Sequence, residues 1–113
     1  DLDPKSDRIQ EALTYARRNL RTLRSVEQLA DAAHLSPRQF SRAFRAETGQ
    51  SPAQAIENLR LEAARLMMEE GRHPIEVVAR ETGFANRERM RRAFLRAYGQ
   101  SPQAMRRQMT AVA

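Results

Sequence analysis

The segment that decides the fold is 42–52, RAFRAETGQSP, because it returns at 92–102 as RAFLRAYGQSP. An upstream segment is repeated as well, with VEQLA at 26–30 and IEVVA at 75–79. The copies are offset by 49 residues at their start and by 50 at their end, so the second copy has gained one residue, between positions 84 and 90. Self-similarity at a fixed offset is typical of a structural unit that is built more than once.

The first copy predicts two helices separated by a tight break. Ser25 and Gln28 have the spacing of a capping box, which marks the start of a short helix. A second helix is expected to begin at Ser36 and Pro37, an N-cap hydroxyl followed by a proline in the first turn. Gly49 is a suitable C-cap for that helix. Two helices joined by such a short turn form a helix-turn-helix.

The second copy repeats this plan, with a short helix at about 75–82 and a longer one at about 86–98. Gly83 falls where His34 stands in the first copy. Glycine adopts a positive φ easily, and histidine tolerates it better than most residues do. We therefore expect a left-handed turn at both positions, and we interpret His34 as a turn residue rather than a metal ligand or a catalytic base.

Three more helices are expected, at about 6–20, at 52–70 and from Ser101 onward, which predicts an all-α fold of about seven helices. The fold would consist of two helix-turn-helix subdomains joined by a long linker helix. We expect the first subdomain at 1–51, the linker helix at 52–71 and the second subdomain, with a C-terminal helix, at 72–113. The residues of the linker helix expected to face inward are Ile56, Leu59, Ala63, Leu66 and Met67.

The composition argues against several classes of protein. The sequence has no cysteine and only two histidines, which are separated in the chain, so neither a metal cluster nor a catalytic triad is apparent. We therefore expect no enzyme activity, no metal and no cofactor. Apolar runs are too short for a membrane span, and the first residues do not resemble a secretion signal. A cytoplasmic protein without a membrane partner is expected.

The positive charge is concentrated in one part of the sequence and suggests a polyanionic partner. The net charge is +6, and residues 84–107 contain seven arginines and one acid. Such a local excess is typical of a surface that binds nucleic acid.

The second helix of each copy is predicted to present this charge on its outer face. Residues at i, i+3, i+4 and i+7 share one side of a helix. In the first copy this stripe consists of Arg38, Ser41, Arg42 and Arg45. In the second copy the outward residues are Arg87, Glu88, Arg91, Arg92 and Arg96. Arginine suits guanine edges and phosphates, whereas Glu88 either accepts from a cytosine amino group or orients a neighbouring arginine, and we favour orientation slightly.

The sequence resembles the AraC/XylS-type DNA-binding domain from about residue 6 to 107. The resemblance is carried by Leu29-Ala30, Leu35-Ser36-Pro37, FSRAF at 40–44, RLEAARLM at 60–67, Gly83-Phe84, Arg92-Ala93-Phe94 and GQSP at 99–102. The sequence looks closest to the branch in which this domain follows a class I glutamine amidotransferase-like domain. It departs from the common pattern at NRERMR, 86–91, which leaves the second half-site hard to predict.

The resemblance implies seven helices in two subdomains, with both recognition helices on one side of a DNA duplex. By position it implies base contacts from Arg38, Ser41, Arg42, Arg87, Glu88, Arg91 and Arg92. It also implies transcription regulation, with double-stranded DNA and RNA polymerase as partners and an effector or dimerisation domain outside this segment. The alternative is a basic helical module that binds an acidic protein. RNA binding is a weaker alternative, because the few aromatic residues are expected to be buried.

Overall fold

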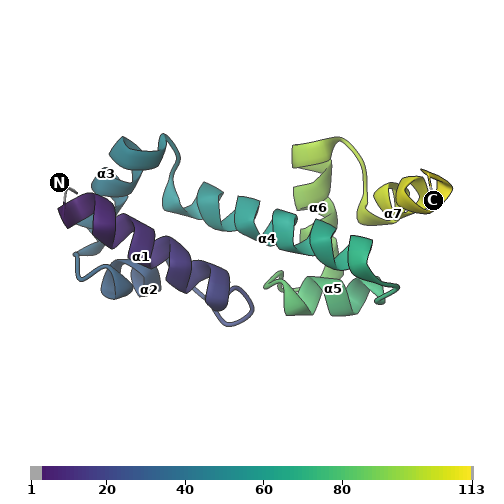
Figure 1. Ribbon diagram of the computed structural model, residues 1–113, viewed down its shortest axis with the longest axis horizontal. Coiled ribbons are helices and arrows are strands. Elements are labelled where there is room, and N and C mark those ends of the chain that lie inside the picture. The colour runs from purple at the N-terminus through teal and green to yellow at the C-terminus, as the bar shows by residue number, and fades with distance from the viewer. Residues whose placement is uncertain (1–3, 113) are drawn as a thin grey trace. The chain divides into compact units, whose positions relative to one another are not determined.

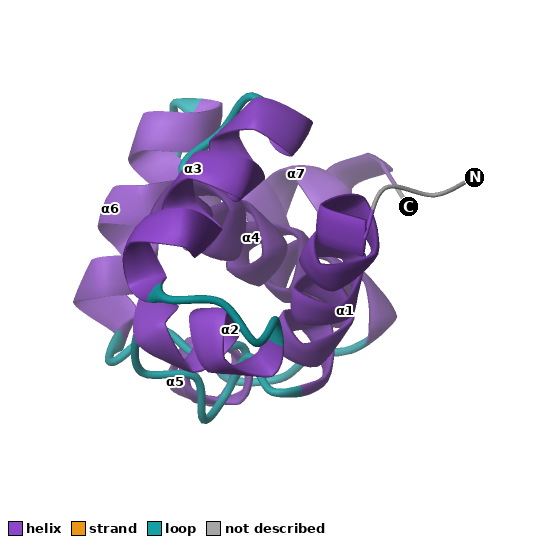
Figure 2. Cartoon of the chain, turned by 90° about the vertical axis from the view of Figure 1, so that its left-hand side faces the viewer, coloured by secondary structure: helices purple, strands orange, loops and turns teal. Residues whose placement is uncertain are grey.

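A computed structural model describes residues 4–112 and contains only helices and short connections over that range (Figures 1 and 2). The expected all-α fold is therefore confirmed. The helices of the described chain are α1 (Pro4–Arg18), α2 (Val26–Ala32), α3 (Pro37–Thr48), α4 (Pro52–Glu70), α5 (Ile75–Glu81), α6 (Arg87–Tyr98) and α7 (Pro102–Val112).

The chain forms two compact units, Asp1–Ile56 and Glu57–Ala113, which meet in sequence inside α4. In the first unit, α1 packs against α2 and α3. The buried residues of this unit come from all of its helices and include Ile9, Leu29, Phe40, Phe44 and Ile56. The rings of Phe40 and Phe44 have centroids 5.5 Å apart, so one face of α3 is fixed against the core of its unit.

The turn between α2 and α3 has the left-handed residue that the repeat predicted. His34 has a φ of 57° and is the only non-glycine residue with a positive φ among the described residues. The backbone N–H of Leu35 donates to the carbonyl of Ala30 at 3.0 Å, which is the closing hydrogen bond of a Schellman-type helix end. α3 then begins with a complete capping box, in which the side chains of Ser36 and Gln39 each accept from the other's backbone N–H at 3.2 Å.

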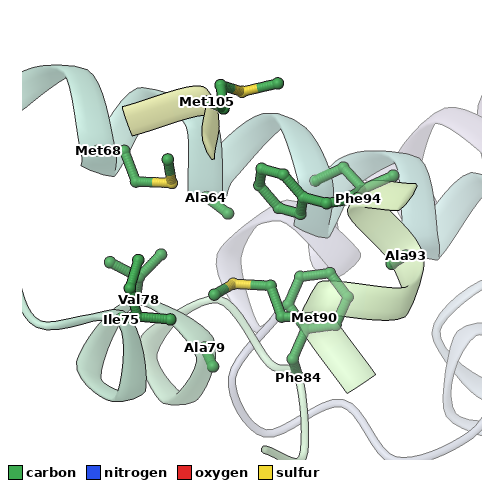
Figure 3. Close-up of a cluster of buried hydrophobic side chains, with 11 residues drawn as sticks. Ala64, Met68, Ile75, Val78, Ala79, Phe84, Met90, Ala93, Phe94 and Met105 are labelled. Carbon is green, nitrogen blue, oxygen red and sulfur yellow. The ribbon is translucent and has the colours of Figure 1, made fainter. Parts of the chain in front are cut away.

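The second unit repeats this arrangement around its own core (Figure 3). The close-up shows Met90 and Phe94 of α6 directed toward side chains of α4 and α5, with Met105 of α7 beside Met68. The buried cluster consists of Leu61, Ala64, Met68, Ile75, Val78, Ala79, Phe84, Met90, Ala93, Phe94 and Met105. Since Met90, Ala93 and Phe94 lie in this core, the opposite face of α6 points to solvent.

The extra residue of the second copy lies in the turn between α5 and α6. Gly83 has a φ of 92°, and Phe84 donates from its backbone N–H to the carbonyl of Ala79 at 2.9 Å, as Leu35 does to Ala30. Asn86 caps α6 by accepting from the backbone N–H of Arg89 at 2.8 Å. The left-handed residues of the two copies are 49 positions apart and the N-caps are 50 apart, so the insertion lies between Gly83 and Asn86. It lengthens the turn and leaves both helices intact.

The repeated GQSP segment ends one helix and starts the next. Gly49 and Gly99 are left-handed C-caps with φ of 76° and 72°. Two residues later, the hydroxyls of Ser51 and Ser101 accept from backbone N–H groups in the first turns of α4 and α7, at 3.2 and 3.1 Å. Proline follows at the first helical position in both copies, where its missing N–H costs nothing.

The predicted inward face of α4 is confirmed only in part, since Leu59, Ala63 and Met67 are partly buried and Met67 packs against the core of the second unit. Ile56 is buried, but Leu66 is 52% exposed, and the buried residues of the second half are Leu61, Ala64 and Met68. α4 has apolar side chains on most of its circumference, so their spacing identifies only part of the face that packs.

α1 was predicted two residues too late at both ends. It spans Pro4–Arg18, and the chain turns after it. The side-chain amide of Asn19 donates to the carbonyl of Tyr15 at 2.8 Å, and the backbone N–H of Thr22 donates to the carbonyl of Asn19 at 3.1 Å. An asparagine side chain competes in this way with the backbone hydrogen bonds of a helix, which explains why α1 ends at Arg18 and not at about residue 20.

Candidate nucleic-acid interface

The stripe predicted on α3 is exposed along its whole length. Arg38, Ser41, Arg42 and Arg45 are all solvent-exposed, while Phe40 and Phe44 on the other side of the helix are fully buried. None of the three arginines forms an ion pair with an acidic side chain within the part of the chain that the structure describes. α3 thus presents three uncompensated guanidinium groups and one hydroxyl on one face.

The stripe predicted on α6 is exposed too, but its arginines are paired. Arg87, Glu88, Arg91, Arg92 and Arg96 are all solvent-exposed. Glu88 accepts two hydrogen bonds from Arg91, from Nε at 2.9 Å and from Nη2 at 2.8 Å, and a third from Nε of Arg92 at 3.3 Å. The structure therefore shows Glu88 holding the guanidinium groups beside it, which is the geometry of the favoured interpretation of this residue.

Two further carboxylates, which the sequence did not indicate, bind the ends of the α6 stripe. Glu76 of α5 pairs with Arg87, and Glu57 of α4 accepts from Nη2 of Arg96 at 2.8 Å. These pairs join residues 11 and 39 positions apart in sequence. No local spacing rule connects such residues, so only the fold reveals them.

Leu95 is an apolar residue within the same stripe. It is 40% exposed and stands at the position of Arg45 in the first copy. Equivalent stripe positions therefore read Arg, Ser, Arg, Arg on α3 and Glu, Arg, Arg, Leu on α6. The two copies present the same geometry with different chemistry.

The hydrogen bonds from Arg91 are the largest cause that lowers the pKa of the Glu88 carboxyl group from 4.5 to about 2. Desolvation is the next largest cause and raises the pKa, while the positive charge of Arg91 and the contacts with Arg92 lower it further. Because the pKa in the folded protein is lowered, Glu88 remains a carboxylate down to a pH of about 2, and its pairing does not titrate near neutral pH.

Replacing Arg91 with glutamine is expected to raise the Glu88 pKa, because it removes the main hydrogen-bond donor to the carboxylate. Carboxyl-carbon NMR of Glu88 during an acid titration measures this pKa directly. Arg92→Gln is the matched control and should raise the pKa less, since Arg92 makes one longer hydrogen bond. Equal shifts in the two variants would contradict the assigned geometry.

The described residues give no indication of a metal site or of a membrane span. They contain no group of three or more histidine, cysteine, aspartate or glutamate residues that could hold a metal ion. Among the helices described, none is long and apolar enough to cross a bilayer.

Comparison with known proteins identifies the class. A model of the helix-turn-helix domain matches residues 29–108. An HTH-type transcriptional regulator of Mycobacterium tuberculosis is 40% identical over 82 residues, covering 73% of this chain and 32% of that protein. The arabinose operon regulatory protein of Escherichia coli is 31% identical over 104 residues, covering 91% of this chain and 36% of that protein. The chain thus spans about a third of the length of these curated relatives.

A solved structure resembles nearly the whole chain. It is the DNA-binding domain of AdpA, a global transcriptional factor, in complex with a target DNA, and it superimposes with a TM-score of 0.87 at 33% identity. The match covers 91% of this chain and 93% of that one. The chain therefore belongs to the helix-turn-helix DNA-binding domains. Within that class it is an AraC-type domain.

Proposed function

We propose that this domain binds double-stranded DNA in a sequence-specific manner and regulates transcription by placing α3 and α6 in two neighbouring major-groove segments. The observation that carries the proposal is the exposed, arginine-bearing stripe on the second helix of both helix-turn-helix copies. An α-helix fits the major groove, where base edges present distinct patterns of donors and acceptors. In this proposal, residues 1–51 form the first DNA-binding subdomain and residues 72–113 form the second. Residues 52–71 form the linker helix between them.

The residues of each stripe take different roles by their position along the helix. Residues in the first half of a recognition helix reach base edges, and those further on meet the phosphate backbone. We assign Arg45 and Arg96 to phosphates. We assign base contacts to Arg38, Ser41 and Arg42 on α3 and to Arg87, Arg91 and Arg92 on α6, and we assign Glu88 the role of orienting Arg91 and Arg92 at that surface.

The target should consist of two unlike half-sites in one duplex. Dimeric repressors read two equal half-sites about one helical turn apart, roughly 34 Å along the axis. Here the recognition helices α3 and α6 differ at three of four equivalent stripe positions, so the DNA target should have no two-fold symmetry. If the half-sites are held slightly closer than one turn, the DNA must bend, at a cost of about a few kcal/mol.

Selection of bound sequences from a random duplex library tests the function. The expected result is two short, different conserved blocks with centres about 10 base pairs apart. A gel-shift assay with the selected duplex and with a scrambled duplex of the same composition then measures the preference. A library that remains random after several rounds would overturn the proposal. So would a single palindromic block.

The wider setting of the domain is also part of the proposal. We propose RNA polymerase as the protein partner and the cytoplasm as the location. We also propose a separate effector or dimerisation domain, of the class I glutamine amidotransferase-like type, in the full-length protein. The resemblance supports that domain, and these relatives are more than twice as long as this chain. Transcription in vitro from a promoter bearing the selected site, with and without protein, tests the partner.

The proposed role is one of binding, not of catalysis, and this agrees with the naming of the relatives as transcriptional regulators. The rival function is a basic helical module for an acidic protein partner. It accounts for the charge but not for the duplicated turn and its two outward stripes. Absence of binding to any duplex at low salt would favour this rival.

A further inference from the structure

The four arginines of the α6 stripe are all paired with carboxylates in the free protein, whereas over the described chain the three arginines of the α3 stripe are not. Each arginine of the α6 stripe contacts a carboxylate: Arg87 contacts Glu76, Arg91 and Arg92 contact Glu88, and Arg96 contacts Glu57. The α3 arginines have no such partner within the described residues. This difference is built into the sequence, because Glu88 stands at the position of Arg38 and Leu95 at that of Arg45.

Resting on the proposed function, we infer that Glu57, Glu76 and Glu88 are positioning residues that set sequence specificity. By holding the α6 arginines, they weaken the attraction of this helix to the phosphates of any DNA. α3 then supplies most of the sequence-independent attraction, and α6 supplies discrimination between sequences.

A carboxylate partner weakens the binding of an arginine to phosphates more than its binding to bases. Affinity for phosphates increases with each positive charge that displaces a counterion from DNA. An arginine that a carboxylate already neutralises displaces fewer counterions from the DNA. A phosphate that approaches such a pair is also repelled by the carboxylate. A neutral guanine edge does not suffer this repulsion. The carboxylates therefore penalise contacts with phosphates more than contacts with the correct bases, which is how a repulsive element creates specificity.

The pairs also fix the direction of the side chains. Glu88 holds Arg91 through two hydrogen bonds, so its guanidinium plane is set before it meets a base. Arginine loses considerable rotamer freedom when it is ordered, and part of that loss has already occurred in the free protein. The planar group remains able to present further N–H donors, since arginine has five.

The ordinary interpretation is that these are surface ion pairs of little consequence. Exposed pairs contribute about 0–1 kcal/mol to stability, and the side chains here are about half exposed. The two interpretations differ in what they predict for DNA. A merely structural pair affects folding slightly and all duplexes equally, while a positioning pair changes the ratio between correct and random sequence.

Arg45 and Arg96 provide a direct comparison, because both are assigned to phosphates but only Arg96 has a carboxylate partner. Arg45→Gln is expected to flatten the dependence of log affinity on log salt by about 0.9. Arg96→Gln is expected to flatten it by clearly less, since Glu57 already neutralises part of its charge. A titration of both variants with salt, on random duplex, measures the two slopes. Equal slopes would contradict the inference.

The decisive experiment removes the carboxylates and retains their shape. Glu57→Gln, Glu76→Gln and Glu88→Gln are made singly and together, and their affinities for the selected and the scrambled duplex are measured. Glu62→Gln is the matched control, because Glu62 is an exposed residue of α4 that forms no ion pair with an α6 arginine in the described structure. Thermal melting of each variant verifies that it is folded.

At about 0.25 M salt, each of the three variants is expected to bind the scrambled duplex about three- to fourfold more tightly than Glu62→Gln does, because one additional free positive charge increases the salt slope by about 0.9. The affinity for the selected duplex should rise less, so the specificity ratio falls. An unchanged ratio in the triple variant would overturn the inference while leaving the proposed function intact. A wild-type protein that does not prefer the selected duplex would overturn the proposed function itself.

Discussion

Replacing Phe94 with alanine is expected to lower the free energy of unfolding by about 3–5 kcal/mol. Phe94 is fully buried in the core of the second unit, and its ring lies 5.3 Å from that of Tyr98 in an edge-to-face arrangement. The substitution removes this contact and leaves a cavity between α4 and α6 that backbone relaxation closes only in part. Urea denaturation followed by circular dichroism measures the loss.

Leu95→Ala is the matched control for Phe94→Ala. It shortens the next side chain in the same helix, but that side chain is 40% exposed, so the loss should be much smaller. Phe44→Ala should repeat the large effect in the first unit, where Phe44 is fully buried against Phe40. Wild-type stability in either phenylalanine variant would show that the helix faces are assigned wrongly.

Replacing Arg42 with alanine is expected to weaken binding to the selected duplex by about 1–3 kcal/mol. Arg42 is exposed in the middle of the α3 stripe and is free of any acidic partner within residues 4–112, so its full donor set is available to a guanine edge. Repeating the sequence selection with the variant should show relaxed preference at one base pair, with the others retained.

Arg17→Ala is the control for Arg42→Ala, because it removes the same charge from an exposed position on α1, outside the stripe. Arg17→Ala should change the affinities for the selected and the scrambled duplex only slightly and preserve every base preference. If Arg42→Ala weakens selected and scrambled duplexes by the same factor, Arg42 is a phosphate contact and not a base contact.

Much of the fold follows from the sequence because its determinants are local. The N-cap at Ser36, the C-cap at Gly49 and the left-handed turn at His34 each depend on a few neighbouring residues, and the structure confirms them. The repeat supplied a second test of the left-handed turn, at Gly83, and of the C-cap, at Gly99. The exposure of both stripes followed from helical spacing once Phe44 and Phe94 were assigned to the cores.

The features that escaped prediction are those that depend on tertiary contacts. The inward face of α4 was identified only in part from spacing, since Leu61 and Leu66 are equally apolar but only Leu61 is buried. The pairs of Glu76 with Arg87 and of Glu57 with Arg96 arise where separate helices come together. The early end of α1 depends on one asparagine side chain, which sequence spacing did not resolve.

The position of the extra residue has a consequence for how such a domain can diverge. One residue added inside α6 would rotate every later side chain by about 100° around the helix axis and would carry arginines into the core. Between Gly83 and Asn86 the added residue changes only the length of the turn, which has five residues here and four in the first copy. After duplication, the two copies could therefore change in length only in such connections, while substitutions on the outer faces remained free to give each copy its own specificity.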